Sequence, residues 1–144
     1  MSRPSPEEDI RRTLARYCML CDDGRFEDFA RLFTEDAQFH VMGTTLTGRD
    51  AIKEFMEAGQ PPELRGKHVA VNSLIEGDGW SGTASAWTDY IFVAQDGSIS
   101  SQGRYHDLLV REGDKTWRFA RREIVFRGGS PEISDLPPAE GGSN

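Results

Sequence analysis

Apolar residues near the start of the chain recur every three or four positions, which is the spacing of an α-helix with one buried face. The recurring residues are Ile10, Leu14, Tyr17, Cys18 and Cys21. They follow Ser5-Pro6-Glu7-Glu8, which combines a capping box with a proline at the first helical position. The pattern therefore predicts a helix that begins after Ser5 and ends at Asp22, just before Gly24.

Two shorter amphipathic segments follow this helix. Residues 26–33 carry apolar side chains at helical spacing and predict a second helix, which forms a hairpin with the first. Residues 37–41 and 44–47 are typical of short strands. A third helix is predicted after Gly48, and Gln60-Pro61-Pro62 ends it.

From His68 onward the chain is typical of long strands separated by turn signals. The predicted strands are His68–Glu76, Ser81–Gln95, Ser98–Arg111 and Thr116–Phe126. Helices first and an antiparallel meander afterwards predict an α+β, cone-shaped roll, in which the N-terminal helices pack inside a strongly curved, mixed, mostly antiparallel sheet that encloses a pocket. We expect one domain over residues 1–127 and a flexible C-terminal tail over 128–144, which is rich in Gly, Pro, Ser and acidic residues.

Composition narrows the classes of partner. With 144 residues, of which 37% are apolar, the chain fits a single core. A net charge of −7 opposes binding to nucleic acid or to an anionic membrane, because both require cationic side chains near phosphate. The chain has no apolar run of about 20 residues and no signal-peptide core at its polar N-terminus. We therefore expect a soluble, cytoplasmic protein.

Cysteine and histidine spacing gives little support for a metal site. Cys18 and Cys21 match a C-x-x-C pattern, but they lie inside the predicted helix and no second cysteine pair exists. We interpret them as small apolar residues on its buried face. His40, His68 and His106 lack any paired ligand spacing, so no metal is expected.

Candidate acid-base residues come from the first helix and two strands. His68 and His106 lie in strand-like segments, and Tyr17 and Asp22 supply the phenol and the carboxylate that an imidazole needs beside it for proton transfer. Asp23 is an equal candidate on sequence alone. Tyr17 precedes Asp22 by five residues, about 140° around a helix, so the two do not strictly share a face.

The order of these segments resembles the SnoaL-like group of the nuclear-transport-factor-2-like (NTF2-like) superfamily, up to Phe126. The resemblance is carried by Tyr17 and Asp22 in the first helix, Leu46–Ile52, His68–Asn72, Gly103–Asp107 and Trp117–Arg122. The branch with scytalone dehydratase and bacterial bile-acid dehydratases is nearest in appearance. The resemblance implies a cofactor-independent dehydratase, isomerase or cyclase that acts by acid-base catalysis on a small, hydrophobic, hydroxylated carbonyl compound, such as a steroid-like, polyketide-like or aromatic one.

By this resemblance Asp22 orients His68 as the base, His106 is the second histidine of the cavity, and Tyr17 is a donor to the substrate oxygen. Residues expected to line the pocket are Asn72, Trp87, Tyr90, Phe92, Leu108 and Phe119. Strand alternation places His106 with Leu108 on one face and Tyr105 with Asp107 on the other. If the second face is the pocket, His106 is a surface residue.

The chain departs from two activities of the superfamily. We see neither the paired acids and arginine of its epoxide hydrolases nor the aspartate and tyrosine arrangement of its ketosteroid isomerases. The alternative to an enzyme is a non-catalytic module of the same fold that binds a small ligand or serves as an assembly subunit. Under either reading the superfamily's exposed sheet face implies a homodimer.

Overall fold

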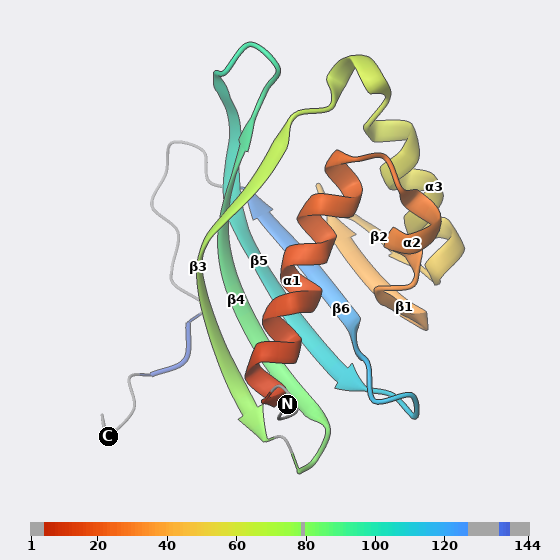
Figure 1. Cartoon of the computed structure of the whole chain (residues 1–144), viewed down its shortest axis with the longest axis vertical. Coiled ribbons are helices and arrows are strands. Elements are labelled where there is room, and N and C mark those ends of the chain that lie inside the picture. The colour runs from red at the N-terminus through yellow and green to blue at the C-terminus, as the bar shows by residue number, and fades with distance from the viewer. Residues whose placement is uncertain (1–4, 79, 127–135, 139–144) are drawn as a thin grey trace.

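The computed structural model describes residues 5–78, 80–126 and 136–138. Its helices are α1 (Pro6–Asp22), α2 (Phe26–Ala30), α3 (Arg49–Gly59) and the short 3-10 helix η1 (Pro62–Leu64). Its strands are β1 (Phe33–Val41), β2 (Thr44–Thr47), β3 (Lys67–Asp78), β4 (Thr83–Val93), β5 (Ile99–Arg111) and β6 (Trp117–Phe126). The helices lie against one face of a curved sheet (Figure 1).

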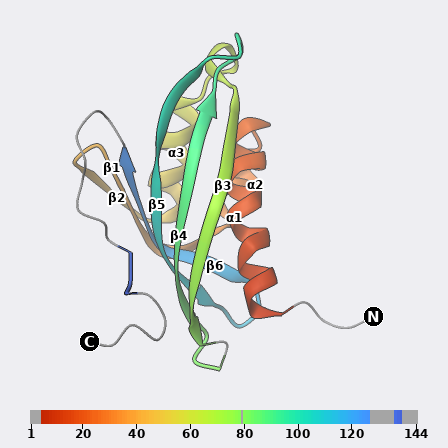
Figure 2. The same ribbon diagram turned by 90° about the vertical axis from the view of Figure 1, so that its left-hand side faces the viewer.

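The sheet is mixed and mostly antiparallel, as predicted, and it is not closed. Its strand order is β2-β1-β6-β5-β4-β3, and β1 and β6 are the parallel pair. Strands β3 to β6 form the expected antiparallel meander. Figure 2 shows β5, β4 and β3 side by side, with α3 behind them and α1 beyond β3; we call the side of the sheet that carries the helices the inner face.

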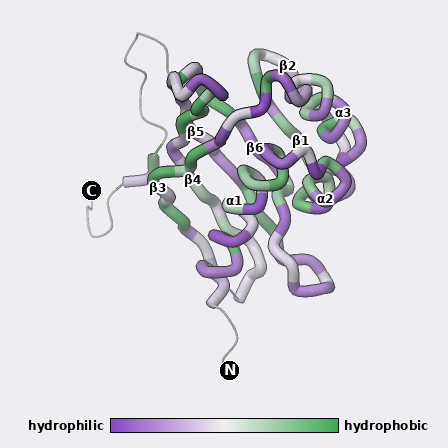
Figure 3. The backbone as a smooth tube through the Cα atoms, turned by 45° about the horizontal axis from the view of Figure 1, so that its top comes forward, coloured by the Kyte–Doolittle hydropathy of each residue, from purple (hydrophilic) through white to green (hydrophobic). Residues whose placement is uncertain are grey.

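Helix α1 forms as the sequence predicts. The Ser5 hydroxyl accepts a hydrogen bond from the Glu8 backbone N–H at 3.1 Å, and Pro6 occupies the first turn. The residues of its apolar series are all buried. In Figure 3, α3 changes between hydrophobic and hydrophilic colour along its length, as expected for an amphipathic helix over a core.

The second helix is shorter than predicted. It ends at Ala30, and β1 begins at Phe33, earlier than the strand expected over residues 37–41. The reason is tertiary: the Leu32 carbonyl accepts a hydrogen bond from the Phe119 backbone N–H at 2.8 Å, and Phe33 pairs with Phe119 in the parallel ladder. A pairing partner this distant in sequence overrides local helical spacing.

Aromatic side chains build the core between α1, α2 and the sheet. Tyr17 lies 5.0 Å from Phe29 between ring centroids, and Phe33 lies 5.2 Å from Phe119. Cys18 and Cys21 are free thiols in this core, and burial raises their pKa values to about 11 and 12. This placement agrees with their interpretation as buried, apolar helix residues.

Two further expectations concern the C-terminal tail and the presence of membrane-spanning helices. The predicted tail over residues 128–144 lies outside the described residues, apart from 136–138. Within the described part of the chain, no helix combines the length and apolar character needed to cross a bilayer.

Candidate functional site

Asp22 and His68 form a closely coupled pair where the end of α1 meets the start of β3. The His68 ring Nδ1 lies 2.6 Å from Asp22 Oδ1. The His68 backbone N–H also donates to both carboxylate oxygens, at 3.1 and 3.0 Å. Their side chains are only 9% and 4% exposed. The carboxylate therefore fixes both the position of the strand and the orientation of the imidazole.

Asp23, the alternative partner, has a different place. It caps the C-terminus of α1, where its backbone N–H donates to the Met19 carbonyl at 2.9 Å. The residue that the structure pairs with His68 is Asp22. With Nδ1 hydrogen-bonded to a carboxylate, an imidazole carries its proton there and presents Nε2 as a base. Among the described residues, none hydrogen-bonds to Nε2 of His68.

Aromatic rings surround the His68 imidazole on the inner face. Phe92 packs edge-on at 4.7 Å between centroids, and Tyr90 and Tyr17 both lie at 6.4 Å. Tyr90 and Phe92 thus lie beside His68, and their role in a pocket stays a prediction. Phe119 is fully buried in the core below Tyr17, with its centroid 6.0 Å away.

Tyr17 lies on the buried face of α1 and is tightly packed. It is 1% exposed, and its ring lies 4.1 Å from the Arg122 guanidinium carbon. Burial raises the pKa of its phenol well above 10, against the opposing effect of the Arg122 charge. The phenol therefore stays protonated and keeps its O–H donor.

Sequence reasoning missed a buried ion pair below this site. Arg122 Nε and Nη2 donate to the two carboxylate oxygens of Asp107 at 2.6 and 2.8 Å, and both side chains are at most 1% exposed. The guanidinium lies among the rings of Tyr17, Tyr105 and Phe119, at 4.1, 3.8 and 4.3 Å. Burial raises the pKa of the Asp107 carboxyl, and the Arg122 charge offsets only part of this increase. The sequence did contain one signal for Asp107: it lies two residues after Tyr105 in the same strand, so the two side chains point to the same face of the sheet.

The prediction that His106 lies in the same cavity as His68 is wrong. Its neighbours Tyr105 and Asp107 point inward and are buried, so His106 points to the opposite, outer face of β5. There its ring stacks on Trp87 at 4.8 Å between centroids. The alternative phase of the strand is the correct one.

Three of the expected pocket residues also lie on the outer face. Trp87 pairs with His106 across β4 and β5, and Leu108 shares the parity of His106. Asn72 was expected beside His68, but the β3 register shifts between Ala70 and Asn72. This bulge turns Asn72 to the outer face, where it is exposed.

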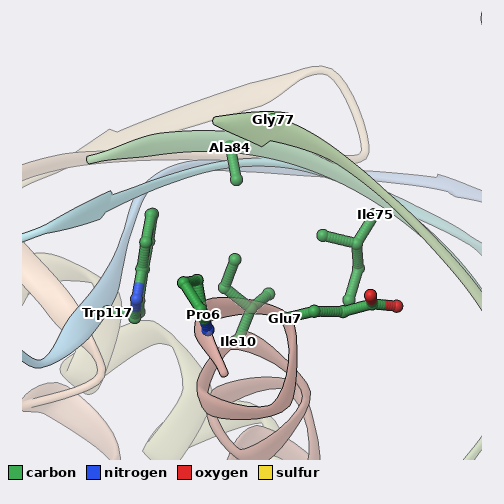
Figure 4. Close-up of a pocket in the computed structure, with 7 residues that line it drawn as sticks. All are labelled: Pro6, Glu7, Ile10, Ile75, Gly77, Ala84 and Trp117. Carbon is green, nitrogen blue, oxygen red and sulfur yellow. The ribbon is translucent and has the colours of Figure 1, made fainter. Parts of the chain in front are cut away.

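A small cavity lies at the other end of α1. It encloses about 90 Å³ between Pro6, Ile10, Ile75 and Trp117 (Figure 4). From Pro6 to Asp22 the helix rises by about 24 Å. This cavity is therefore separate from the Asp22–His68 pair.

Among the described residues, no group of three or more His, Cys, Asp or Glu side chains is arranged to hold a metal ion. The remaining histidine, His40, has Nδ1 2.8 Å from the Thr45 hydroxyl on β2.

A solved NTF2-like protein with a cystatin-like fold has a similar structure, with a TM-score of 0.75. The model of the SnoaL-like domain matches residues 4–123, and the chain belongs to this family. A comparison with proteins of curated function gives no significant match.

Three solved structures illustrate the range of the similar proteins. Rv3472 of Mycobacterium tuberculosis, described as of unknown function, is 30% identical, with a TM-score of 0.74 over 83% of this chain and 70% of that one. A candidate scytalone dehydratase of Novosphingobium aromaticivorans is 25% identical, with a TM-score of 0.73 over 92% and 91%. A Catenulispora acidiphila protein in complex with S-DNPA is 26% identical, with a TM-score of 0.67 over 82% and 92%.

Proposed function

We propose that the protein is a cofactor-independent lyase of the dehydratase type, or a related isomerase or cyclase, which acts on a small hydroxylated carbonyl compound with a hydrophobic ring. The observation that carries the proposal is the contact of 2.6 Å between Asp22 and the His68 ring. A carboxylate held against Nδ1 stabilises the imidazolium that forms when Nε2 takes a proton. The similar N. aromaticivorans structure, designated a candidate scytalone dehydratase, supports the same class of reaction.

The proposed elimination uses His68 twice. Its Nε2 removes the proton from the carbon beside the carbonyl, and the electrons of that C–H bond form an enolate whose oxygen accepts a hydrogen bond from the Tyr17 phenol. The enolate then expels the hydroxyl group on the next carbon. That hydroxyl takes the proton back from the imidazolium and leaves as water. This sequence needs no contribution from His106, which lies on the outer face.

The rings beside His68 fit a flat, apolar substrate. Phe92 and Tyr90 lie at 4.7 and 6.4 Å from the imidazole, and stacking on such rings orients a cyclic compound. The complex of the similar C. acidiphila protein with S-DNPA supports binding of a small molecule by this fold.

The test is to compare Asp22→Asn and His68→Ala with the wild-type protein on a panel of β-hydroxy ketones that carry phenyl or naphthyl rings. Formation of the conjugated enone is followed by its absorbance. Loss of a general base lowers turnover by roughly 100- to 10,000-fold. Asp23→Asn is the matched control, because Asp23 has the same chemistry one residue away and does not contact His68.

Full turnover by either variant on a ketone that the wild-type protein dehydrates contradicts the proposal. Tight binding of ring compounds without any product, at equal affinity in the wild-type protein and His68→Ala, indicates the binding module instead.

We also propose that two copies pair through the outer face of the sheet. Leu74 and Leu108 are 42% and 41% exposed on the two sides of the Trp87–His106 stack. Sedimentation of the wild-type protein is expected to give a dimer and that of Leu108→Glu a monomer. A monomeric wild-type protein at tens of micromolar contradicts this proposal.

A further inference from the structure

Arg65 is held in a fixed position between η1 and β3, three residues before His68. Its Nε donates to the Gln60 carbonyl at 3.0 Å, and its guanidinium carbon lies 5.7 Å from the centroid of the Phe26 ring. Both contacts restrict a side chain that is otherwise among the most mobile. The entropy of ordering this cation is therefore lost on folding and not on binding a ligand.

The flat face of the guanidinium rests on Gly24. A Cβ atom at Gly24 would lie 2.5, 2.5 and 2.8 Å from Cζ, Nη1 and Nη2 of Arg65. Because these three distances are nearly equal, the plane faces the glycine and its N–H bonds point sideways, along the plane. In the described part of the chain, Nη1 and Nη2 have no hydrogen-bond partner.

Arg65 lies beside the Asp22–His68 pair. Gly24 follows Asp22 by two residues, so the Arg65 guanidinium stacks on the turn that directly follows Asp22 at the end of α1. On the other side, a Cβ at Gly66 would lie 3.0 Å from the Phe92 ring, which itself packs on His68. The C-terminal end of α1 and the start of β3 lie at the same end of the molecule in Figure 1. The cation and the proposed base thus belong to one neighbourhood.

The nearby acidic side chains of α2 have other partners. Asp28 forms ion pairs with Arg25 and Arg31, and Glu27 binds Lys53 Nζ at 2.7 Å. None of these contacts involves Arg65. Its charge is consequently available to a ligand that approaches the site.

We propose that Arg65 binds a carboxylate of the substrate, so that the Asp22–His68 site acts on an anionic hydroxy carbonyl compound. This inference rests on the proposed function for the reaction but not for the binding. Two N–H groups along one edge of a guanidinium match the two oxygens of a carboxylate. Asp22 and Asp23 lie close by, and their charges disfavour a dianionic phosphate more than a monoanionic carboxylate.

The experiment compares naphthoate with naphthamide, which have the same ring and differ in charge. Binding is measured by calorimetry at neutral pH and low salt. The wild-type protein is expected to bind naphthoate about tenfold more tightly, the effect of one charge-assisted hydrogen-bonded contact. Arg65→Gln is expected to remove this preference, because the substitution weakens the binding of naphthoate more than that of naphthamide. Arg25→Gln is the matched control, because Arg25 is a nearby arginine already paired with Asp28.

Equal affinity of the wild-type protein for the two probes, or no binding of naphthoate, overturns the inference. A preference that survives in Arg65→Gln does the same, and so does tighter binding of naphthyl phosphate than of naphthoate. Circular dichroism verifies that each variant is folded. If Asp22→Asn keeps full turnover while Arg65→Gln loses the naphthoate preference, the proposed reaction falls and the carboxylate site stands.

Discussion

The buried pair of Asp107 and Arg122 is expected to be costly to break. Asp107→Asn removes the charge but keeps the size of the side chain, which leaves the Arg122 guanidinium charged and only 1% exposed. Breaking a buried ion pair on one side costs about 3–5 kcal/mol. Because small domains have about 5–15 kcal/mol of stability in total, the variant should lose a large fraction of it.

Asp89 and Arg104 provide the matched control. Their ion pair joins neighbouring strands at 2.7 Å, as the buried pair does, but the two side chains are 36% and 17% exposed. A pair exposed at the surface contributes about 0–1 kcal/mol, and this pair is far more accessible to water than the buried one, so Asp89→Asn should cost much less than Asp107→Asn. Urea unfolding followed by circular dichroism gives both free energies of unfolding by linear extrapolation.

A double variant, Asp107→Leu with Arg122→Met, separates the loss of pairing from the loss of packing. Replacing both partners by apolar side chains is often neutral or stabilising, so this variant should be more stable than Asp107→Asn. The reasoning is refuted if Asp107→Asn and Asp89→Asn cost the same, or if the double variant is the least stable of the three.

Two further predictions concern the buried thiols of α1 and the close approach of Gly66 to β4. The raised pKa values of Cys18 and Cys21 mean that the folded state keeps the thiol protons to higher pH than the unfolded state. The contribution of these thiols to stability is complete below about pH 9 and is lost as the pH rises toward 11 and 12. In that pH range, the urea midpoint of the variant with Cys18→Ala and Cys21→Ala should therefore fall less steeply than that of the wild-type protein. Gly66→Ala should destabilise by more than about 1 kcal/mol, because its Cβ would lie 2.1 Å from the Val93 carbonyl oxygen, whereas Gly59→Ala, with open space around it, should not. Equal thermal midpoints for the two glycine variants contradict this.

The sequence predicts the main elements of the fold because their signals are local. The capping box of α1 and the turn residues between β3 and β6 act within a few positions, and the structure places the elements accordingly. The start of β1 is not predictable in this way, since it depends on the pairing of Phe33 with Phe119. Local spacing contains no information about that partner.

The candidate site likewise has features that the sequence predicts and features that depend on tertiary structure. The proximity of Asp22 and His68 follows from the family resemblance, which already contains the tertiary arrangement. The face of His106 depends on the phase of β5, and alternation alone leaves two choices. The face of Asn72 depends on the bulge after Ala70, which no residue type in that segment signals. Arg121 and Arg122 are adjacent and chemically identical, so the sequence does not indicate that Arg122 is the buried one.

The parallel pairing of β1 with β6 has a consequence for how the chain acquires its structure. Phe33 and Phe119 are 86 residues apart (119 minus 33), so their contact closes one of the longest loops in the domain. The hairpins between β3, β4 and β5 close much shorter loops, so their formation costs less conformational entropy. During synthesis β6 is made last, so the aromatic side chains of α1 and α2 lack their packing partners on this strand until then. Any chain that stops before Trp117 leaves these side chains exposed to association with other chains.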